Sequence, residues 1–454
     1  MAVSIFNPSH GVQLPPLVFK AMFDSLERPL VVKGQLQPWM QAQSWKVTDV
    51  CSILGKHGEI TTFKICPREG SESFKKRFKK NDPIFETQCD YVDATFTDFV
   101  EWLSVAQCQL NEPASKKLKI DTTASDHTPK FDGLSNPLLQ YASSEYWVYA
   151  DYKYMCHVCR DHPELLSAIN WSLFGFDGCN GTESTLWIGS EGAFTPCHYD
   201  TYGCNIVAQL SGVKKWTLFS PTDSDYLYPT RLPYEESSVF SGVNVVSPDL
   251  EKYPLFQHTT AFTALLEPGD VLYVPKHWWH YVQSMGSEPT LSVNMWIQQE
   301  SFPHERVKEA ITRTLISQFT AHLAEPEVPP DWINPNEVIL STGENLKLLS
   351  KMVHDRKYQL TSTNCAADGR DSKSGSPSIT NKTSSKRNII SGSDDPCTGS
   401  EHQQHQKQQS DIEIPSKKDI TKREISMQDF VKAITDDKVV TLISNILLKN
   451  AHVL

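Results

Sequence analysis

Three side chains that can bind a metal ion stand in two short segments of this 454-residue chain. His198 and Asp200 belong to the tripeptide His-Tyr-Asp, and His280 follows the aromatic pair Trp278 and Trp279. Side chains two residues apart on a β-strand point to the same face, so His198 and Asp200 can reach one ion. Two imidazoles and one carboxylate leave further coordination positions of that ion open. The donor set therefore predicts a non-haem iron(II) centre at which a cosubstrate and oxygen can meet.

The sequence around these residues decides between a metal centre and a chance pattern. A core histidine beside a turn aspartate gives the same tripeptide. However, the distal histidine ends the run Pro-Lys-His-Trp-Trp-His, and residues 184–298 alternate short apolar runs with turn residues, which is typical of an antiparallel sheet or barrel. The predicted strands are 184–188, 205–210, 214–219, 262–266, 271–274, 280–283 and 291–297, with turns at Gly212 and 268–270.

The rest of the chain divides by composition into parts that flank this barrel. We predict α/β elements over 1–110, a polar loop over 111–136, the barrel core over 137–300, a helical region over 301–362, a disordered linker over 363–424 and terminal helices over 425–454. The linker is rich in Ser, Thr, Gln and Lys and cannot bury enough apolar area to offset the entropy of ordering. The apolar stripe of a predicted helix over 304–323 needs a partner surface, either the barrel or a second copy of the chain in a homodimer.

Charge and cysteine usage restrict the environment and the partners. The formal net charge is -11 and the isoelectric point lies near 5.8, which does not favour binding to nucleic acid. The N-terminus lacks the basic and apolar regions of a secretory signal, and no apolar run approaches the roughly 18 residues of a membrane span. The 11 cysteines are spread irregularly. We therefore expect a cytoplasmic protein with reduced thiols and no membrane segment.

Two local patterns are interpreted as unrelated to the site. The basic run from Lys75 to Lys80 is predicted to be a solvated surface in preference to a phosphate-binding patch. Cys156 and Cys159 form a Cys-x-x-Cys pair, but no second pair follows at the spacing of a zinc site, so we interpret the pair as coincidental.

From Gly181 to Gln298 the sequence resembles the JmjC (cupin) family of iron(II)- and 2-oxoglutarate-dependent oxygenases, most of all its protein-hydroxylase branch. The matching blocks are LWIGSEGAFTPCHYD, KKWTLFSP, LYPTRLPYEESSVF, PGDVLYVPKHWWH and SVNMW. The resemblance implies a mainly β fold with flanking helices, in which the barrel is a double-stranded β-helix (jelly roll). It also implies that His198, Asp200 and His280 are the iron ligands.

The family binds the distal carboxylate of 2-oxoglutarate with a lysine, a threonine and a tyrosine, which the resemblance places at Lys214, Thr195 and Tyr149. Asn205 and Asn294 match positions that line the cosubstrate pocket. By residue type alone, a lysine beside a Gly turn is an ordinary hairpin residue and Asn294 an ordinary strand amide. Compared with the hydroxylase branch, one residue more stands between His198 and Lys214, so the loop beside the metal is expected to be reshaped.

The resemblance implies two functions from different classes. The first is a 2-oxoglutarate-dependent dioxygenase that hydroxylates a polypeptide side chain. The second is a non-catalytic binding protein of the same fold that regulates a small heat-shock protein of the twenty-seven-kilodalton type, in the cellular stress response. The resemblance to one branch of the family implies such a partner, and the two functions are compatible.

Overall fold

The computed structural model describes residues 1–8, 14–111, 136–232, 238–297, 302–320, 340–367 and 433–450. The chain forms two compact units, Met1–Lys357 with Val431–Leu454, and Tyr358–Phe430. The first unit contains every described strand. In the second unit only residues 358–367 are described, and they are the last part of a helix.

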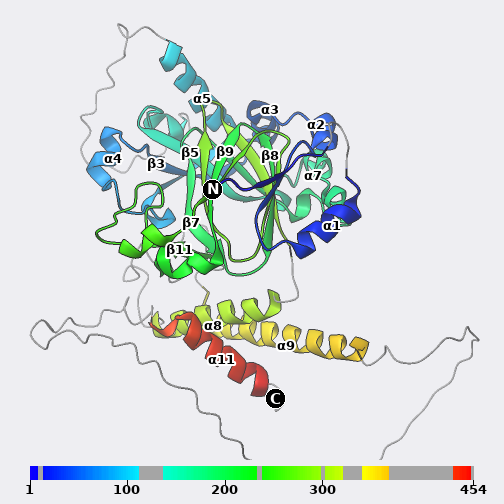
Figure 1. The fold of residues 1–454 in the computed structure, drawn as a ribbon. Coiled ribbons are helices and arrows are strands. Elements are labelled where there is room, and N and C mark those ends of the chain that lie inside the picture. Colours follow the sequence, from blue (N-terminus) through cyan, green and yellow to red (C-terminus); the bar gives the residue numbers. More distant parts are fainter. Residues whose placement is uncertain are drawn as a thin grey trace, which may run out of the picture. The chain divides into compact units, whose positions relative to one another are not determined.

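Two β-sheets form the body of the first unit (Figure 1). The nine-stranded sheet has the order β1-β2-β13-β8-β15-β6-β5-β3-β4 and the six-stranded sheet the order β10-β11-β7-β14-β9-β12. The strands of the nine-stranded sheet are β1 (Ser4–Phe6), β2 (Leu30–Val32), β3 (Ile60–Pro67), β4 (Asp90–Thr95), β5 (Tyr146–Tyr154), β6 (Thr185–Gly189), β8 (Cys204–Ser211), β13 (Val271–Val274) and β15 (Thr290–Ile297). Those of the six-stranded sheet are β7 (Phe194–Asp200), β9 (Val213–Phe219), β10 (Pro229–Thr230), β11 (Ser238–Ser241), β12 (Phe262–Leu266) and β14 (Trp279–Met285).

Successive strands from β6 to β9 and from β12 to β15 alternate between the two sheets, and their pairings are antiparallel. This alternation is the winding of a double-stranded β-helix, so the predicted jelly-roll fold with flanking helices is confirmed. Each of the seven predicted strands is found, and two of them, 262–266 and 271–274, have the predicted bounds. The strand β7 was not among the predicted strands, although it carries His198 and Asp200.

Helices flank the nine-stranded sheet and follow the barrel. They are α1 (Pro16–Ser25), α2 (Gln37–Ala42), α3 (Val47–Leu54), α4 (Glu72–Arg77), α5 (Phe96–Asn111), α6 (Met155–Val158), α7 (Pro163–Ala168), α8 (Phe302–Thr320), α9 (Thr342–Ala367) and α11 (Asp437–Asn450). Single 3-10 turns are η1 (Glu86–Gln88), η3 (Pro137–Gln140), η4 (Trp171–Phe174), η5 (Gly181–Glu183), η6 (Pro221–Leu227) and η7 (Pro254–His258). None of the described helices is both long and apolar enough to cross a bilayer.

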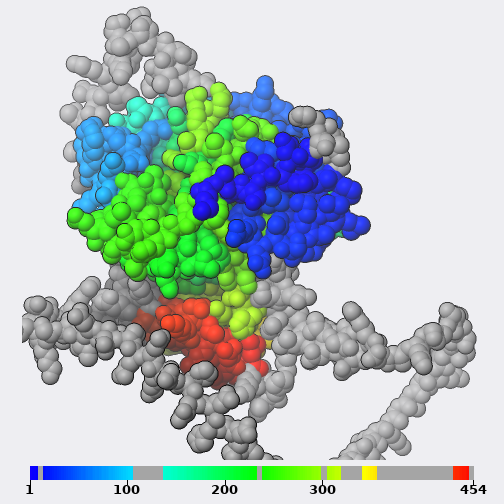
Figure 2. Space-filling view, in the orientation of Figure 1, coloured from blue at the N-terminus to red at the C-terminus, as the bar shows by residue number. Residues whose placement is uncertain are grey.

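Strand alternation separates two hydrophobic cores on the faces of β8. Ile206 and Ala208 belong to the large cluster that α1, α2, α3 and α5 complete, whereas Val207 belongs to a second cluster with Trp216 of the opposite sheet. The odd-numbered residues of β8, Asn205 included, therefore face the inside of the barrel. Figure 2 shows the N-terminal residues, in blue, lying directly against the barrel.

The helix α8 packs against its own chain. Arg231, next to β10, forms a bidentate ion pair with Glu309 of α8, with N–O distances of 2.7 and 3.0 Å. On another side of α8, Val307 and Ile311 are buried with Val440 of α11. The apolar stripe of α8 thus packs on α9 and α11 of its own chain, whereas the contact with the barrel is the ion pair, so the stripe lies on a surface that the sequence did not offer.

The polar regions differ in how far the structure describes them. The helix α9 continues to Ala367, beyond the boundary at residue 362 that the sequence predicted. The remainder of the predicted disordered linker, from 368 to 424, lies outside the described residues, as do most of the predicted loop 111–136 and the start of the terminal region. The predicted C-terminal helix is present as α11.

Candidate metal centre

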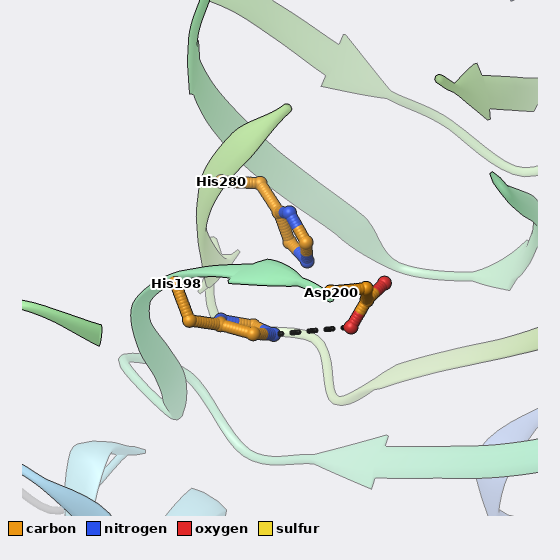
Figure 3. Close-up of side chains that lie close together, drawn as sticks. All are labelled: His198, Asp200 and His280. Atoms are coloured by element: carbon orange, nitrogen blue, oxygen red, sulfur yellow. Dashed lines mark ion pairs between the residues drawn. The ribbon is translucent and has the colours of Figure 1, made fainter. Parts of the chain in front are cut away.

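The two strands that carry the predicted ligands are neighbours in the six-stranded sheet. His198 on β7 lies directly opposite His280 on β14, and the two imidazole centroids are 4.2 Å apart. One ligand atom from each of His198, Asp200 and His280 lies within 4.8 Å of the other two (Figure 3). Among the described residues no other group of histidine, cysteine and acidic side chains meets this criterion, so Cys156 and Cys159 form no such site.

A β-bulge in β7 sets which residues face the centre. His280 pairs with His198 and Val282 pairs with Thr195, so three steps along β7 match two steps along β14. Residues three apart on a regular strand point to opposite faces, and the extra residue of a bulge reverses this relation. The bulge therefore brings Thr195 to the same inner face as His198 and Asp200.

Backbone carbonyls orient both imidazoles. Nδ1 of His198 donates to the Pro196 carbonyl at 2.8 Å, and Nδ1 of His280 donates to the Trp278 carbonyl at 3.0 Å. Because a carbonyl can only accept, each Nδ1 carries the proton and each Nε2 presents a lone pair to the centre. Burial lowers the pKa of His198 and lowers the pKa of His280 to about 4, so both rings are neutral ligands near pH 7.

The residues predicted for the cosubstrate meet inside the barrel, where Thr195 shares the inner face of β7 with His198. Nζ of Lys214 donates to Oγ of Ser292 at 2.7 Å and to the Tyr149 hydroxyl at 3.3 Å. The Thr195 hydroxyl also forms a hydrogen bond with Tyr149. Lys214 is only 2% exposed, which excludes the surface hairpin alternative. Burial lowers the pKa of Lys214 to about 7, and no carboxylate among the described residues counteracts this shift.

One strand, β15, contacts each part of the site in turn. Its inward residues Ser292, Asn294 and Trp296 touch Lys214, Asn205 and Asp200 respectively. The Asn294 amide donates to Asn205 at 2.9 Å, and the Trp296 indole donates to Oδ2 of Asp200 at 3.1 Å. Sequence reasoning identified Asn294 but missed Ser292 and Trp296. Their positions two residues before and after Asn294 were the available signal.

The loop after Asp200 is held by the turn that precedes β14 and by α8. His277 has a left-handed backbone with a φ of 64°, which is uncommon for a residue with a Cβ. Its Nε2 donates to the Thr201 carbonyl at 2.9 Å, and the guanidinium of Arg306 from α8 lies 5.6 Å from the ring centroid of Tyr202. Thr201 and Tyr202 are thus held between the turn before His280 and α8.

A cavity of about 1160 Å³ lies on the other face of the strands that carry the ligands. Phe194 and Cys197 of β7 and Tyr281 and Gln283 of β14 line it, in alternation with the residues that face the metal centre. No metal ligand lines this cavity.

The sequence pattern of a family described as "Cupin-like domain" matches residues 16–301, which contain every described strand except β1 and all of the predicted site. The chain belongs to the cupin-like domain family. Curated relatives of this cupin-like chain include HSPB1-associated protein 1 of Mus musculus, 47% identical over 319 residues, and its homolog in Danio rerio, 41% identical over 331 residues. The Jumonji C domain-containing protein 5 of Drosophila melanogaster is 37% identical over 110 residues, which are 24% of this chain and 26% of that protein.

The coverage of these relatives is partial. The mouse match covers 70% of this cupin-like chain and 58% of the relative, and the zebrafish match covers 72% and 65%. The chain therefore spans about three fifths of the length of these two relatives.

Proposed function

We propose that the chain is an iron(II)- and 2-oxoglutarate-dependent oxygenase that hydroxylates a polypeptide side chain. The observation that carries this proposal is a three-ligand centre beside a buried lysine that has no acidic partner among the described residues. When bound, iron(II) and 2-oxoglutarate supply oxygen activation for the hydroxylation of a carbon–hydrogen bond.

The donor chemistry at the centre fits iron(II). His198, Asp200 and His280 offer two neutral nitrogens and one carboxylate oxygen, the set that leaves coordination positions open for other ligands. Two of the three are nearly fully buried, with His198 5% and His280 4% exposed. Their role would be to hold the ion in a site from which most water is excluded.

The buried polar cluster fits the distal carboxylate of 2-oxoglutarate. A dicarboxylate would supply the negatively charged partner that Lys214 lacks among the described residues, and the hydroxyls of Tyr149 and Thr195 would add hydrogen bonds. Charge-assisted hydrogen bonds of this kind contribute about 1.5–3 kcal/mol each. Asn205 and Asn294, which bond to each other, would line the same pocket.

The binding partner and the location are part of the same proposal. Because the relatives are named for an association with HSPB1, we infer that a small heat-shock protein is a partner of this chain, which connects it with cellular stress. The cytoplasm is the proposed location, since the eight cysteines whose side chains the structure describes are free, in keeping with a reducing compartment.

A second function, binding without catalysis, is favoured by one observation. The relatives are named for a partner and not for a reaction. In this alternative the barrel is a scaffold that regulates the small heat-shock protein.

Conversion of 2-oxoglutarate to succinate by the iron-loaded protein tests the oxygenase proposal. We expect His198→Ala to abolish succinate formation, because one of three ligands is lost. His157→Ala, which removes an imidazole outside the site, serves as the matched control and should retain it. A wild-type protein that binds the heat-shock partner but forms no succinate would support the binding function instead.

A further inference from the structure

A buried ionic cluster lies next to the cosubstrate residues. Lys64 of β3 is ion-paired with Asp151 of β5 at 2.5 Å and with Glu86 of η1 at 3.1 Å. The three side chains are 0–1% exposed. Burying charges is costly, and two carboxylates around one ammonium satisfy it from two sides.

The cluster is aligned with Tyr149 by the sheet itself. Lys64 pairs directly with Tyr149 across the β3–β5 ladder, and Asp151 stands two residues after Tyr149 on β5. Nζ of Lys64 lies 5.3 Å from the centroid of the Tyr149 ring, and Nζ of Lys214 lies 5.3 Å from the same centroid. One ring therefore contacts two ammonium groups, and only Lys64 is neutralised by carboxylates.

The ring of Tyr149 is also restricted by the strand on its other side. Tyr149 pairs with Gly189 of β6, where an added Cβ would lie 3.0 Å from Cδ2 of the ring. The ring thus packs against the backbone of Gly189, and Trp187 contacts it at a centroid distance of 6.0 Å. Of the two lysines that contact the ring, Lys64 is the one that was not predicted to bind the cosubstrate.

We propose that Lys64, fixed by Glu86 and Asp151, is a positioning residue that holds the ring of Tyr149 so that its hydroxyl faces Lys214. The negative face of an aromatic ring attracts an ammonium group, and the two carboxylates keep this ammonium in place. The inference rests on the proposed function in one respect, namely that the Tyr149 hydroxyl serves 2-oxoglutarate. The placement of the ring itself does not depend on that function.

The test removes the charges without leaving a buried carboxylate unpaired. The variant Lys64→Met/Glu86→Gln/Asp151→Asn keeps the approximate shape of the cluster. The control Lys33→Met/Glu267→Gln/Asp270→Asn removes another lysine with two carboxylate partners, at N–O distances of 2.6 and 3.5 Å, in a more exposed position. Calorimetry on the Mn(II)-loaded proteins should show 2-oxoglutarate affinity reduced on the order of tenfold in the first variant only, the scale of one desolvated cation–π contact. Mn(II) affinity should be unchanged in both.

Two further results decide the inference. In a Tyr149→Phe background the triple change should cause no additional loss, because the hydroxyl that it positions is absent. If the triple variant does not fold, Glu86→Gln alone should weaken 2-oxoglutarate binding in the same direction, and unchanged binding would overturn the inference.

A readout independent of the proposed function is the crystal structure of the variant without cosubstrate. A displaced Tyr149 ring supports the positioning role, and a ring in its original place overturns it. Wild-type protein that binds no 2-oxoglutarate would overturn the proposed function, and the ring position would still decide the role of Lys64.

Discussion

Trp296 donates a hydrogen bond from its indole nitrogen to Oδ2 of Asp200, at 3.1 Å. The other carboxylate oxygen, Oδ1, lies 3.9 Å from Nε2 of His198, as the dashed line in Figure 3 shows. The indole thus occupies one oxygen of the carboxylate and leaves the other oriented towards the shared ligand position. Hydrogen bonds to ligands of this kind commonly determine how strongly a metal is held.

Trp296→Phe removes this hydrogen bond and keeps most of the ring. We expect Mn(II) affinity to fall by about 10- to 100-fold, which equilibrium binding followed by electron paramagnetic resonance measures. Trp187→Phe is the matched control, since its indole donates to Asn294 at 2.7 Å and contacts no metal ligand. Equal losses in the two variants would show that the effect is not specific to Asp200.

The pH dependence of cosubstrate binding follows from Lys214. Burial lowers the pKa of Lys214 to about 7, and only the protonated ammonium attracts a carboxylate. The affinity of the Mn(II)-loaded protein for 2-oxoglutarate should therefore fall as pH rises above about 7, approaching tenfold per pH unit. Lys214→Met should bind weakly with no such dependence. A pH-independent affinity of the wild type, measured by calorimetry, would argue against the role of Lys214.

Lys214 also affects stability in the absence of cosubstrate. Its pKa in the folded protein is below the ordinary lysine value of 10.5, so the unfolded state binds more protons between the two pKa values. The contribution of this group to the free energy of unfolding should therefore increase as pH rises from about 7 towards about 10. Urea unfolding of wild type and of Lys214→Met, at about pH 7 and about pH 10, measures this increase in the free energy of unfolding. The part of the increase that Lys214 causes should be absent in the variant.

The ion pair between Arg231 and Glu309 holds α8 on the barrel. Glu309→Ala leaves a largely buried guanidinium without its bidentate partner, so we expect the free energy of unfolding to fall by about 3–5 kcal/mol. Glu72→Ala is the control, because its pair with Lys75 is 60–72% exposed. That change should leave the free energy of unfolding nearly unchanged, because water screens an exposed pair. Comparable losses from both in urea unfolding would contradict the structural role of the buried pair.

The turn before Lys214 depends on a glycine. Gly212 has a φ of +63°, and a Cβ there would lie 2.6 Å from the Pro289 carbonyl oxygen. Gly286 has a φ of +78° and no atom within 4 Å of such a Cβ. Gly286→Ala should cost about 1–2 kcal/mol from backbone strain alone, and Gly212→Ala clearly more because of the clash. Equal thermal unfolding temperatures for the two variants would refute the close approach.

The sequence predicted most strands of the barrel but not β7, which carries two of the three candidate metal ligands. The pattern of apolar residues predicted the bounds of β12 and β13 correctly. It did not reveal β7, because Pro196 and the bulge between Thr195 and His198 interrupt the two-residue alternation of a strand. The helix α9 continues beyond residue 362, where the polar composition of the following residues predicted its end. Prediction of a strand from sequence depends on regular alternation of apolar and polar residues, and this alternation is interrupted in the strand that carries two of the candidate ligands.

For the candidate site, the sequence identified the metal ligands and the residues predicted to bind the cosubstrate. It did not identify Ser292, Trp296 and Lys64, which contact them. His198, Asp200 and His280 converge as the sequence implied, although metal binding by them stays a prediction. Ser292 and Trp296 have ordinary sequence contexts, and only the pairing of β15 shows what they contact. Lys64 resembles a surface lysine in the sequence, because its two carboxylate partners come from other elements of the fold.

The proposed function requires that His198, Asp200 and His280 bind one iron(II) ion that also chelates 2-oxoglutarate. Anaerobic titration followed by visible absorbance measures this chelation. We predict a weak charge-transfer band in the wild type when iron(II) and 2-oxoglutarate are both present, and none in His280→Ala. The absence of a band in the wild type, or an undiminished band in His280→Ala, would contradict the account.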